Sequence, residues 1–236
     1  GEGSRIGNGS RMKYGIPTSK GAGIFCFREQ RVAKRLVLAR HGDLGEGYRG
    51  RYVGRTDVPL TAEGRRQAAA MAGELGRIGG AHILCSPLVR ARETAEIALG
   101  EERDFTIDDD LREIDFGRWD AMSFAEIAVA DPAAVDRWAA LEDDFSFPDG
   151  ESIGAFRGRV GAVAGRIAAD PAETVVAFTH GGIIRLLICH FLGLEYRRYL
   201  LFDVRPGSLS EIAAEGDRGV LIRLNDRCHL AGERED

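Results

Sequence analysis

Two segments of the chain share one pattern, LVLARHG over residues 36–42 and TVVAFTHGG over residues 174–182. Each begins with a short apolar run that is typical of a buried strand, and each turns polar at a histidine followed by glycine. In a parallel sheet the carboxyl ends of the strands lie along one edge, which is where ligands bind in open α/β folds. The pattern therefore predicts that His41 and His180 lie close together at that edge.

The sequence around these two segments alternates between predicted strands and predicted helices. Thr61, Ser86 and Ser152 are suited to cap helices, and Pro87 is suited to a first helical turn. The other predicted elements are helices over 62–75, 87–99, 123–141 (interrupted near Pro132), 153–169 and 183–192, strands over 82–85 and 105–107, and a hairpin of 208–213 with 220–224. We expect an α/β fold, a three-layer sandwich with a largely parallel central sheet, helices on both faces and an antiparallel closing hairpin.

Length and composition fit one sizeable domain with short extensions. The chain has 236 residues, and its hydrophobic fraction of 44% is enough to fill one core. Residues 1–34 are rich in glycine, serine and basic residues and show no sustained period, which predicts a disordered N-terminal extension. We place the domain over residues 35–225 and a C-terminal tail over residues 226–236.

The charge and cysteine patterns argue against several kinds of ligand. The formal net charge is −5, so the overall field does not favour binding to nucleic acid or to an anionic membrane. An anionic ligand would be held by a local cluster of arginines. The four cysteines are widely separated and lack metal-ligand spacing, so we expect reduced thiols in a cytoplasmic protein with no metal and no cofactor. No apolar run reaches the roughly 18 residues that span a bilayer.

The residues at the predicted sheet edge suit a phosphate group. Arg40 and Arg90 can supply planar guanidinium forks that match phosphate oxygens. The glycines after each histidine let the backbone approach an anion, and a helix that starts just after Gly181 would direct free N–H groups at it. Each of these features is a weak signal when taken alone.

The ordered set of motifs resembles the histidine phosphatase superfamily, also called phosphoglycerate mutase-like, over Arg35 to Asn225. The motifs are LARHG over 38–42 for the catalytic RHG, GRTD over 54–57 with LTAEG over 60–64, SPLVRARETA over 86–95 for SPL-x-RA-x-x-TA, LRE over 111–113 for the segment that carries the acid, and HGG over 180–182 for the second histidine. Their common order along the chain makes the resemblance specific.

The resemblance implies a role for each matching residue. His41 is the nucleophile, because a neutral imidazole can attack phosphorus and carry the phosphoryl group. Arg40 and Arg90 bind the phosphoryl oxygens, and His180 completes the pocket. Glu113 protonates the leaving oxygen, with Asp115 as a possible neighbour that raises its pKa.

We further expect Gly54, Arg55 and Gly181 to contact the substrate beside Arg40 and Arg90. One position departs from the family pattern, because Gly47 stands where many members have an asparagine that donates to the phosphoryl group. Either a backbone N–H or one of Arg49, Arg51 and Arg55 takes over this contact, or activity is lower.

The implied activity is hydrolysis of a small phosphate monoester by a monomer or homodimer. Residues 50–61 and 111–120 look most like the α-ribazole phosphatase branch, so α-ribazole 5′-phosphate is the leading substrate hypothesis. Its flat ring needs an apolar or aromatic wall, for which Tyr48, Tyr52 and Trp119 are candidates, although aromatic residues are more often part of a core.

Three other functions remain open from the sequence. The first is a phosphatase of broad specificity. The second is a phosphoglycerate mutase, for which the interval between Glu113 and His180 is short. The third is a catalytically silent phosphoryl-binding module, which the loss of asparagine at Gly47 would permit.

Overall fold

The computed structural model describes residues 33–100 and 103–231. The predicted N-terminal extension falls almost wholly on residues 1–32, which lie outside the described residues, and so do residues 232–236 of the predicted C-terminal tail.

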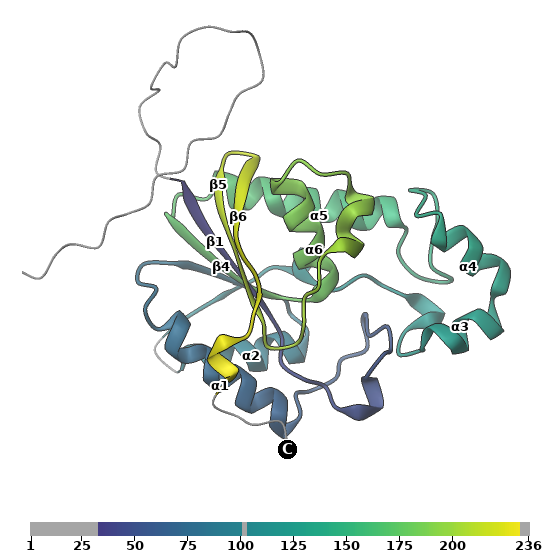
Figure 1. Ribbon diagram of the computed structural model, residues 1–236, viewed down its shortest axis with the longest axis horizontal. Coiled ribbons are helices and arrows are strands. Elements are labelled where there is room, and N and C mark those ends of the chain that lie inside the picture. The colour runs from purple at the N-terminus through teal and green to yellow at the C-terminus, as the bar shows by residue number, and fades with distance from the viewer. Residues whose placement is uncertain (1–32, 101–102, 232–236) are drawn as a thin grey trace, which may run out of the picture. The chain divides into compact units, whose positions relative to one another are not determined.

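A six-stranded sheet forms the centre of the domain, in the strand order β3-β2-β4-β1-β5-β6 (Figure 1). The strands are β1 (Lys34–Arg40), β2 (His82–Cys85), β3 (Thr106–Ile107), β4 (Thr174–Thr179), β5 (Leu209–Glu215) and β6 (Arg218–Asp226). Strands β3, β2, β4 and β1 are parallel, whereas β5 pairs antiparallel with both β1 and β6. The expected largely parallel sheet with a closing hairpin is confirmed.

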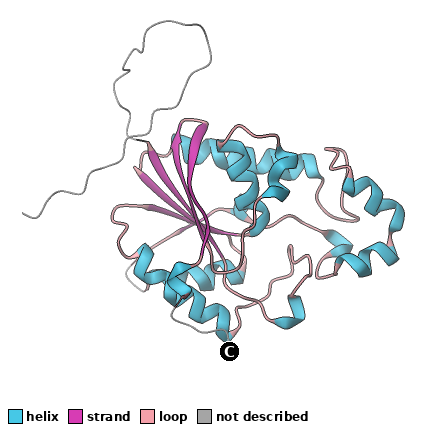
Figure 2. Cartoon of the chain, in the orientation of Figure 1, coloured by secondary structure: helices cyan, strands magenta, loops and turns pink. Residues whose placement is uncertain are grey.

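Helices cover both faces of this sheet (Figure 2). The helices are α1 (Ala62–Leu75), α2 (Val89–Leu99), α3 (Phe124–Ala130), α4 (Pro132–Ala139), α5 (Ile153–Ala169) and α6 (Gly181–Phe191). Val37 and Ala39 of β1 belong to the core formed with α1 and α2, whereas Leu36 and Leu38 belong to the core formed with α5 and α6. This alternation is expected of a strand that is buried on both faces, and it confirms the three-layer sandwich. None of the described helices is long and apolar enough to cross a membrane.

Two of the predicted helix caps are present. The hydroxyl of Thr61 accepts a hydrogen bond from the N–H of Gly64 at 3.0 Å, and the hydroxyl of Ser152 accepts one from Ala155 at 3.0 Å. These bonds satisfy N–H groups that have no partner within the helix, which explains where α1 and α5 begin. Pro132 opens α4, so the predicted interruption after α3 is also found.

The predicted start of α2 was wrong. The helix begins at Val89 rather than at Pro87, and the hydroxyl of Ser86 lies 2.7 Å from Nε2 of His180 instead of capping the helix. The N–H of Val89 donates to the carboxylate of Asp57 at 2.7 Å, so a distant residue satisfies this helix end. Helix α6 also begins earlier than predicted, at Gly181, directly after the second histidine.

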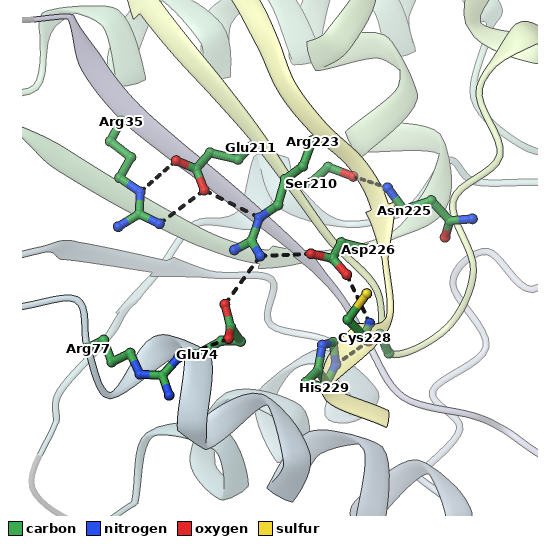
Figure 3. A network of polar contacts seen from close by, with 11 residues as sticks. Arg35, Glu74, Arg77, Ser210, Glu211, Arg223, Asn225, Asp226, Cys228 and His229 are labelled. Carbon is green, nitrogen blue, oxygen red and sulfur yellow. Dashed lines mark hydrogen bonds and ion pairs between the residues drawn. The ribbon is translucent and has the colours of Figure 1, made fainter. Parts of the chain in front are cut away.

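A polar network holds the antiparallel hairpin against the rest of the domain (Figure 3). Arg223 of β6 contacts Glu74 of α1 at 3.3 Å, Glu211 of β5 at 3.3 Å and Asp226 at 3.0 Å. Glu211 also receives two hydrogen bonds from Arg35 of β1, at 2.7 and 3.0 Å. Because Arg223 and Glu211 are mostly buried, salt and solvent screen these contacts less than they screen exposed ion pairs.

Candidate active site

The two histidines lie at the ends of neighbouring strands, as predicted. Arg40 pairs with Thr179 in the parallel register of β1 and β4, and the N–H of His41 donates to the carbonyl of Thr179 at 3.1 Å. The rings of His41 and His180 have their centroids 5.2 Å apart. The central pair of strands therefore positions the floor of the site.

His41 has one ring nitrogen bound and the other available. Its Nδ1 lies 2.8 Å from the carbonyl oxygen of Gly42, and a carbonyl only accepts hydrogen bonds, so we assign the proton to Nδ1. The Nε2 lone pair is then free to act as a nucleophile. Burial lowers the pKa of His41 well below 6.5, and the positive charges of Arg90 and Arg40 lower it further. The imidazole is therefore neutral at pH 7, the form that can attack phosphorus.

Arg40 lines the cavity next to His41 and is free to bind an anion. Its Nη1 donates to the carbonyl of Val204, whereas its buried Nε has no partner among the described residues. Burial lowers the pKa of Arg40 to about 10, while the Glu113 carboxylate raises it. The guanidinium is therefore still charged at neutral pH.

Arg90 is fully buried and lies beneath the histidines. Its Nε donates to Nδ1 of His180 at 3.2 Å, and its Nη groups donate to the carbonyls of Thr56 at 2.9 Å and Gly54 at 2.7 Å. Burial lowers the pKa of Arg90. The positive charge of Arg90 thus acts on both histidines, and most of its N–H groups are already bonded within the protein.

His180 is held in one tautomer by its two neighbours. Because Arg90 can only donate, Nδ1 of His180 accepts, and Nε2 carries the proton that it donates to the hydroxyl of Ser86 at 2.7 Å. Burial lowers the pKa of His180 well below 6.5, and the charge of Arg90 adds to this effect. The second histidine is therefore a neutral, fixed group behind His41.

Glu113 is placed at the N-terminus of α6. One carboxylate oxygen accepts from the N–H of Gly182 at 2.9 Å, and the other accepts from Ile114 at 3.0 Å. Glu113 is 9% exposed as a whole residue and lines the cavity with His41. The expected neighbour Asp115 instead accepts from the N–H of Gly117 at 2.9 Å and does not line the cavity.

Gly54 and Arg55 lie beside the site but not in the cavity wall. Their N–H groups both donate to the carboxylate of Asp120, at 2.9 and 2.7 Å. Burial and the nearby charge of Arg159 lower the pKa of Arg55, whose side chain faces a separate group of charged residues. Gly181 does line the cavity, next to the guanidinium of Arg40.

Gly47 occupies the position at which many family members have an asparagine, and its surroundings show whether a nearby arginine can take over the contact. Gly47 is exposed in the 3₁₀ turn Glu46–Tyr48, and a Cβ there would meet nothing within 4 Å. Arg49 pairs with Glu46 at 2.6 Å, and Arg51 pairs with Glu126 at 2.6 Å. Both arginines line the cavity, but their side chains are bound to these carboxylates.

Several positioning residues had no role assigned from the sequence. The hydroxyl of Thr94 accepts from the N–H of Gly42 at 3.1 Å and donates to the carbonyl of Arg90 at 2.7 Å. Gln67 accepts from the N–H of Asp43 at 3.0 Å. Ser86 and Thr94 both lie within the matched segment 86–95, which was the available signal, whereas nothing in the sequence singled out Gln67.

The site opens into a cavity of about 1750 Å³. Eight arginines and four carboxylates line it, so its wall is positive although the whole chain carries a net charge of −5. Tyr48 and Tyr52 are part of this wall, as the sequence suggested. Trp119 is instead a core residue with 1% of its surface exposed, and its indole N–H donates to Asp131 at 2.7 Å. In the described part of the chain, no three His, Cys, Asp or Glu residues form a group that could hold a metal ion.

Comparison with known proteins agrees with this geometry. The family model of the histidine phosphatase superfamily (branch 1) matches residues 36–227. Phosphoserine phosphatase 1 of Hydrogenobacter thermophilus is 32% identical over 83% of this chain and 94% of its own. The adenosylcobalamin/alpha-ribazole phosphatase of Escherichia coli is 29% identical over 82% of this chain and 96% of its own. The crystal structure of a putative alpha-ribazole-5′-P phosphatase from Escherichia coli superposes with a TM-score of 0.75 at 29% identity, covering 83% and 97% of the two chains. The resemblance and the expected type of enzyme are thus confirmed: the chain belongs to the histidine phosphatase superfamily and is a phosphatase.

Proposed function

We propose that the chain hydrolyses a phosphate monoester in two steps through a phosphohistidine at His41, and that the substrate is α-ribazole 5′-phosphate. In the first step Nε2 of His41 forms a bond to phosphorus while the bond to the ester oxygen breaks. Glu113 gives its proton to that oxygen, so the alcohol leaves neutral. In the second step Glu113 takes a proton from water, the hydroxide attacks phosphorus, and the P–N bond to His41 breaks to release phosphate.

The charge that develops on the phosphoryl oxygens needs stabilisation. Arg40 supplies a guanidinium at the cavity wall, and the N-terminus of α6 at Gly181 adds a favourable dipole. Arg90 and His180 act from behind, because their N–H groups are bonded within the protein. One arrangement carries the proposal: the neutral imidazole of His41, the charged guanidinium of Arg40 and the carboxyl group of Glu113 line the same cavity.

The choice of substrate rests on the aromatic side of the cavity. Tyr52, Phe116, Trp138 and Phe147 line it and contact one another, with ring centroids 5.4 Å apart for Tyr52 and Phe116, 5.0 Å for Tyr52 and Trp138, and 5.0 Å for Phe116 and Phe147. We call these four residues the aromatic wall. A flat benzimidazole ring can stack on such a surface, and two kinds of comparison include proteins named for α-ribazole phosphate.

Two measurements test the proposal. Brief reaction with ³²P-labelled substrate should give an acid-labile, base-stable adduct that His41→Ala abolishes; an adduct on serine or cysteine would refute the mechanism. A substrate panel should then favour α-ribazole 5′-phosphate over 3-phosphoglycerate and glucose 6-phosphate by at least about tenfold in kcat/KM, equivalent to about 1.4 kcal/mol.

Phosphoserine belongs in the same panel as the second candidate, because the 32% identical relative is named for it. If phosphoserine is hydrolysed best, it replaces α-ribazole 5′-phosphate and the two-step mechanism stands. A flat profile would indicate a phosphatase of broad specificity. Transfer of the label from one phosphoglycerate position to another would indicate a mutase.

A further inference from the structure

Arg185 is a cationic residue of the cavity wall that has no part in the mechanism above. Of the eight arginines that line the cavity, five pair with carboxylates, and these are Arg49, Arg51, Arg66, Arg157 and Arg205. The other three have no carboxylate oxygen within 4.0 Å among the described residues, and these are Arg40, Arg185 and Arg227. Because Arg185 has no acidic partner there, its guanidinium is available to bind oxygen atoms of a ligand.

Arg185 lies one helical turn beyond the phosphoryl site. It follows Gly181 and Gly182 in α6, and helical side chains lean toward the N-terminus, which brings its guanidinium toward the catalytic end of the helix. Its Nε donates to the carbonyl of Phe202 at 2.8 Å, two residues before the carbonyl that holds Arg40. Its positive charge also lowers the pKa of Arg40. The Nη groups of Arg185 make no hydrogen bond with the residues that the structure describes.

Tyr199 supplies a second unused polar group in the same region. It belongs to the 3₁₀ helix Tyr196–Leu201 and lines the cavity, and its hydroxyl makes no hydrogen bond with the described residues. Burial raises the pKa of Tyr199 to about 12; the positive charge of Arg185 lowers it, and the carboxylate of Glu113 raises it. Tyr199 therefore stays protonated, and it lines the same cavity as Glu113 and the aromatic wall.

We infer that Arg185 and Tyr199 form a subsite for a pair of neighbouring oxygen atoms on the leaving group, between the ester oxygen and the aromatic wall. The inference rests on the proposed phosphatase mechanism and refines its substrate class. In α-ribazole 5′-phosphate the two oxygens are ribose hydroxyls, and in phosphoserine they are the carboxylate. The two Nη groups of a guanidinium match two adjacent acceptors, and the tyrosine hydroxyl can donate or accept.

The test compares substrates with and without these oxygens in the Arg185→Met variant. The leaving group of phenyl phosphate has no oxygen atom besides the ester oxygen, whereas the leaving groups of α-ribazole 5′-phosphate and phosphoserine carry the proposed pair. We expect kcat/KM to fall about 10- to 100-fold for the better of these two substrates, the scale of a lost charged hydrogen bond, and less than about threefold for phenyl phosphate. The ratio between two substrates does not depend on the fraction of folded enzyme, so a destabilised variant still gives an answer.

Two further variants sharpen the result. Arg157→Met removes one charge from the same cavity, and we expect its losses to be similar for all substrates. Tyr199→Phe should lower kcat/KM for the same substrates as Arg185→Met, but by a smaller factor. An equal loss on all substrates, phenyl phosphate included, would place Arg185 on the phosphoryl group, and wild-type kcat/KM on all of them would show that it binds no part of the substrate; either outcome overturns the inference. Neither outcome would affect the labelling of His41, so failure of the subsite is distinguishable from failure of the mechanism.

Discussion

Gly182 leaves no room for a side chain next to the proposed acid. A Cβ built on Gly182 would lie 2.3 Å from one carboxylate oxygen of Glu113 and 3.1 Å from its carboxyl carbon. Cβ atoms essentially never lie within 3.0 Å of another heavy atom, and ordinary contact begins at 3.4 Å, so Gly182→Ala forces the carboxylate to move by about 1 Å. The backbone itself tolerates alanine, because Gly182 does not have a positive φ.

The expected result is a catalytic loss without a loss of stability. A misplacement of about 1 Å costs on the order of 100-fold in rate, and the complete removal of a general acid costs about 10²- to 10⁴-fold. Alanine near the start of a helix stabilises it by up to about 1 kcal/mol relative to glycine, which offsets the local crowding. Gly182→Ala should therefore lose about 100-fold in kcat on an alkyl phosphate and keep the melting temperature of the wild type.

The assay uses two leaving groups and a neighbouring substitution. An alkoxide needs the proton from Glu113 far more than p-nitrophenolate does, so the loss should be much smaller with p-nitrophenyl phosphate. Gly181→Ala provides the comparison, because its Cβ would lie 3.4 Å from the nearest atom of Arg40, an ordinary contact, and its loss should be smaller. Wild-type turnover of alkyl phosphates by Gly182→Ala would refute this reasoning, as would equal losses with both leaving groups.

Three further predictions concern the acid, the histidines and metals. Glu113→Gln should lower turnover of alkyl phosphates by about 10²- to 10⁴-fold and affect p-nitrophenyl phosphate less; equal effects would exclude Glu113 as the acid. His41 and His180 have folded-state pKa values below the unfolded value of about 6.5, so the unfolded chain takes up protons first as the pH falls. Their contribution to stability is then complete above about pH 6.5 and decreases below it, and urea unfolding at pH 7 and pH 5 should show a smaller decrease for the His41→Asn/His180→Asn double variant than for the wild type. Turnover should be unchanged in EDTA, because arginines supply the positive charge, and loss of activity that a divalent ion restores would contradict this.

Local sequence patterns predicted the elements that depend on local bonds. Thr61 and Ser152 cap the helices that follow them, because a hydroxyl needs only an N–H three residues ahead. Ser86 has the same local pattern, but its hydroxyl binds His180, which lies 94 residues further along the chain. The local pattern cannot reveal this competition, so the start of α2 was wrong by two residues.

Parts of the site were likewise beyond what the sequence determines. The repeated strand ending placed His41 and His180 at one edge of the sheet, because that edge depends only on strand direction, and the direct pairing of β1 with β4 brings them together. The N–H groups of Arg90 are bonded to the carbonyls of residues 54 and 56, and no periodicity predicts which loop a buried arginine meets; its expected contact with the phosphoryl oxygens stays a prediction. Trp119 lies in the core, as is more common for an aromatic residue than a place in a ligand-binding wall, and its indole N–H donates to Asp131 there.

The backbone around the nucleophile is fixed on both sides, whereas the cavity wall is built from connecting segments. The N–H of His41 donates to Thr179 of β4, and its carbonyl accepts from Gly207 at 2.9 Å. Tyr48 and Tyr199 belong to short 3₁₀ segments outside the sheet. Replacements in these segments can change which leaving group fits without moving His41. Evolution of a new substrate therefore requires few coordinated changes, and relatives named for phosphoserine and for α-ribazole phosphate can keep one reaction on one scaffold.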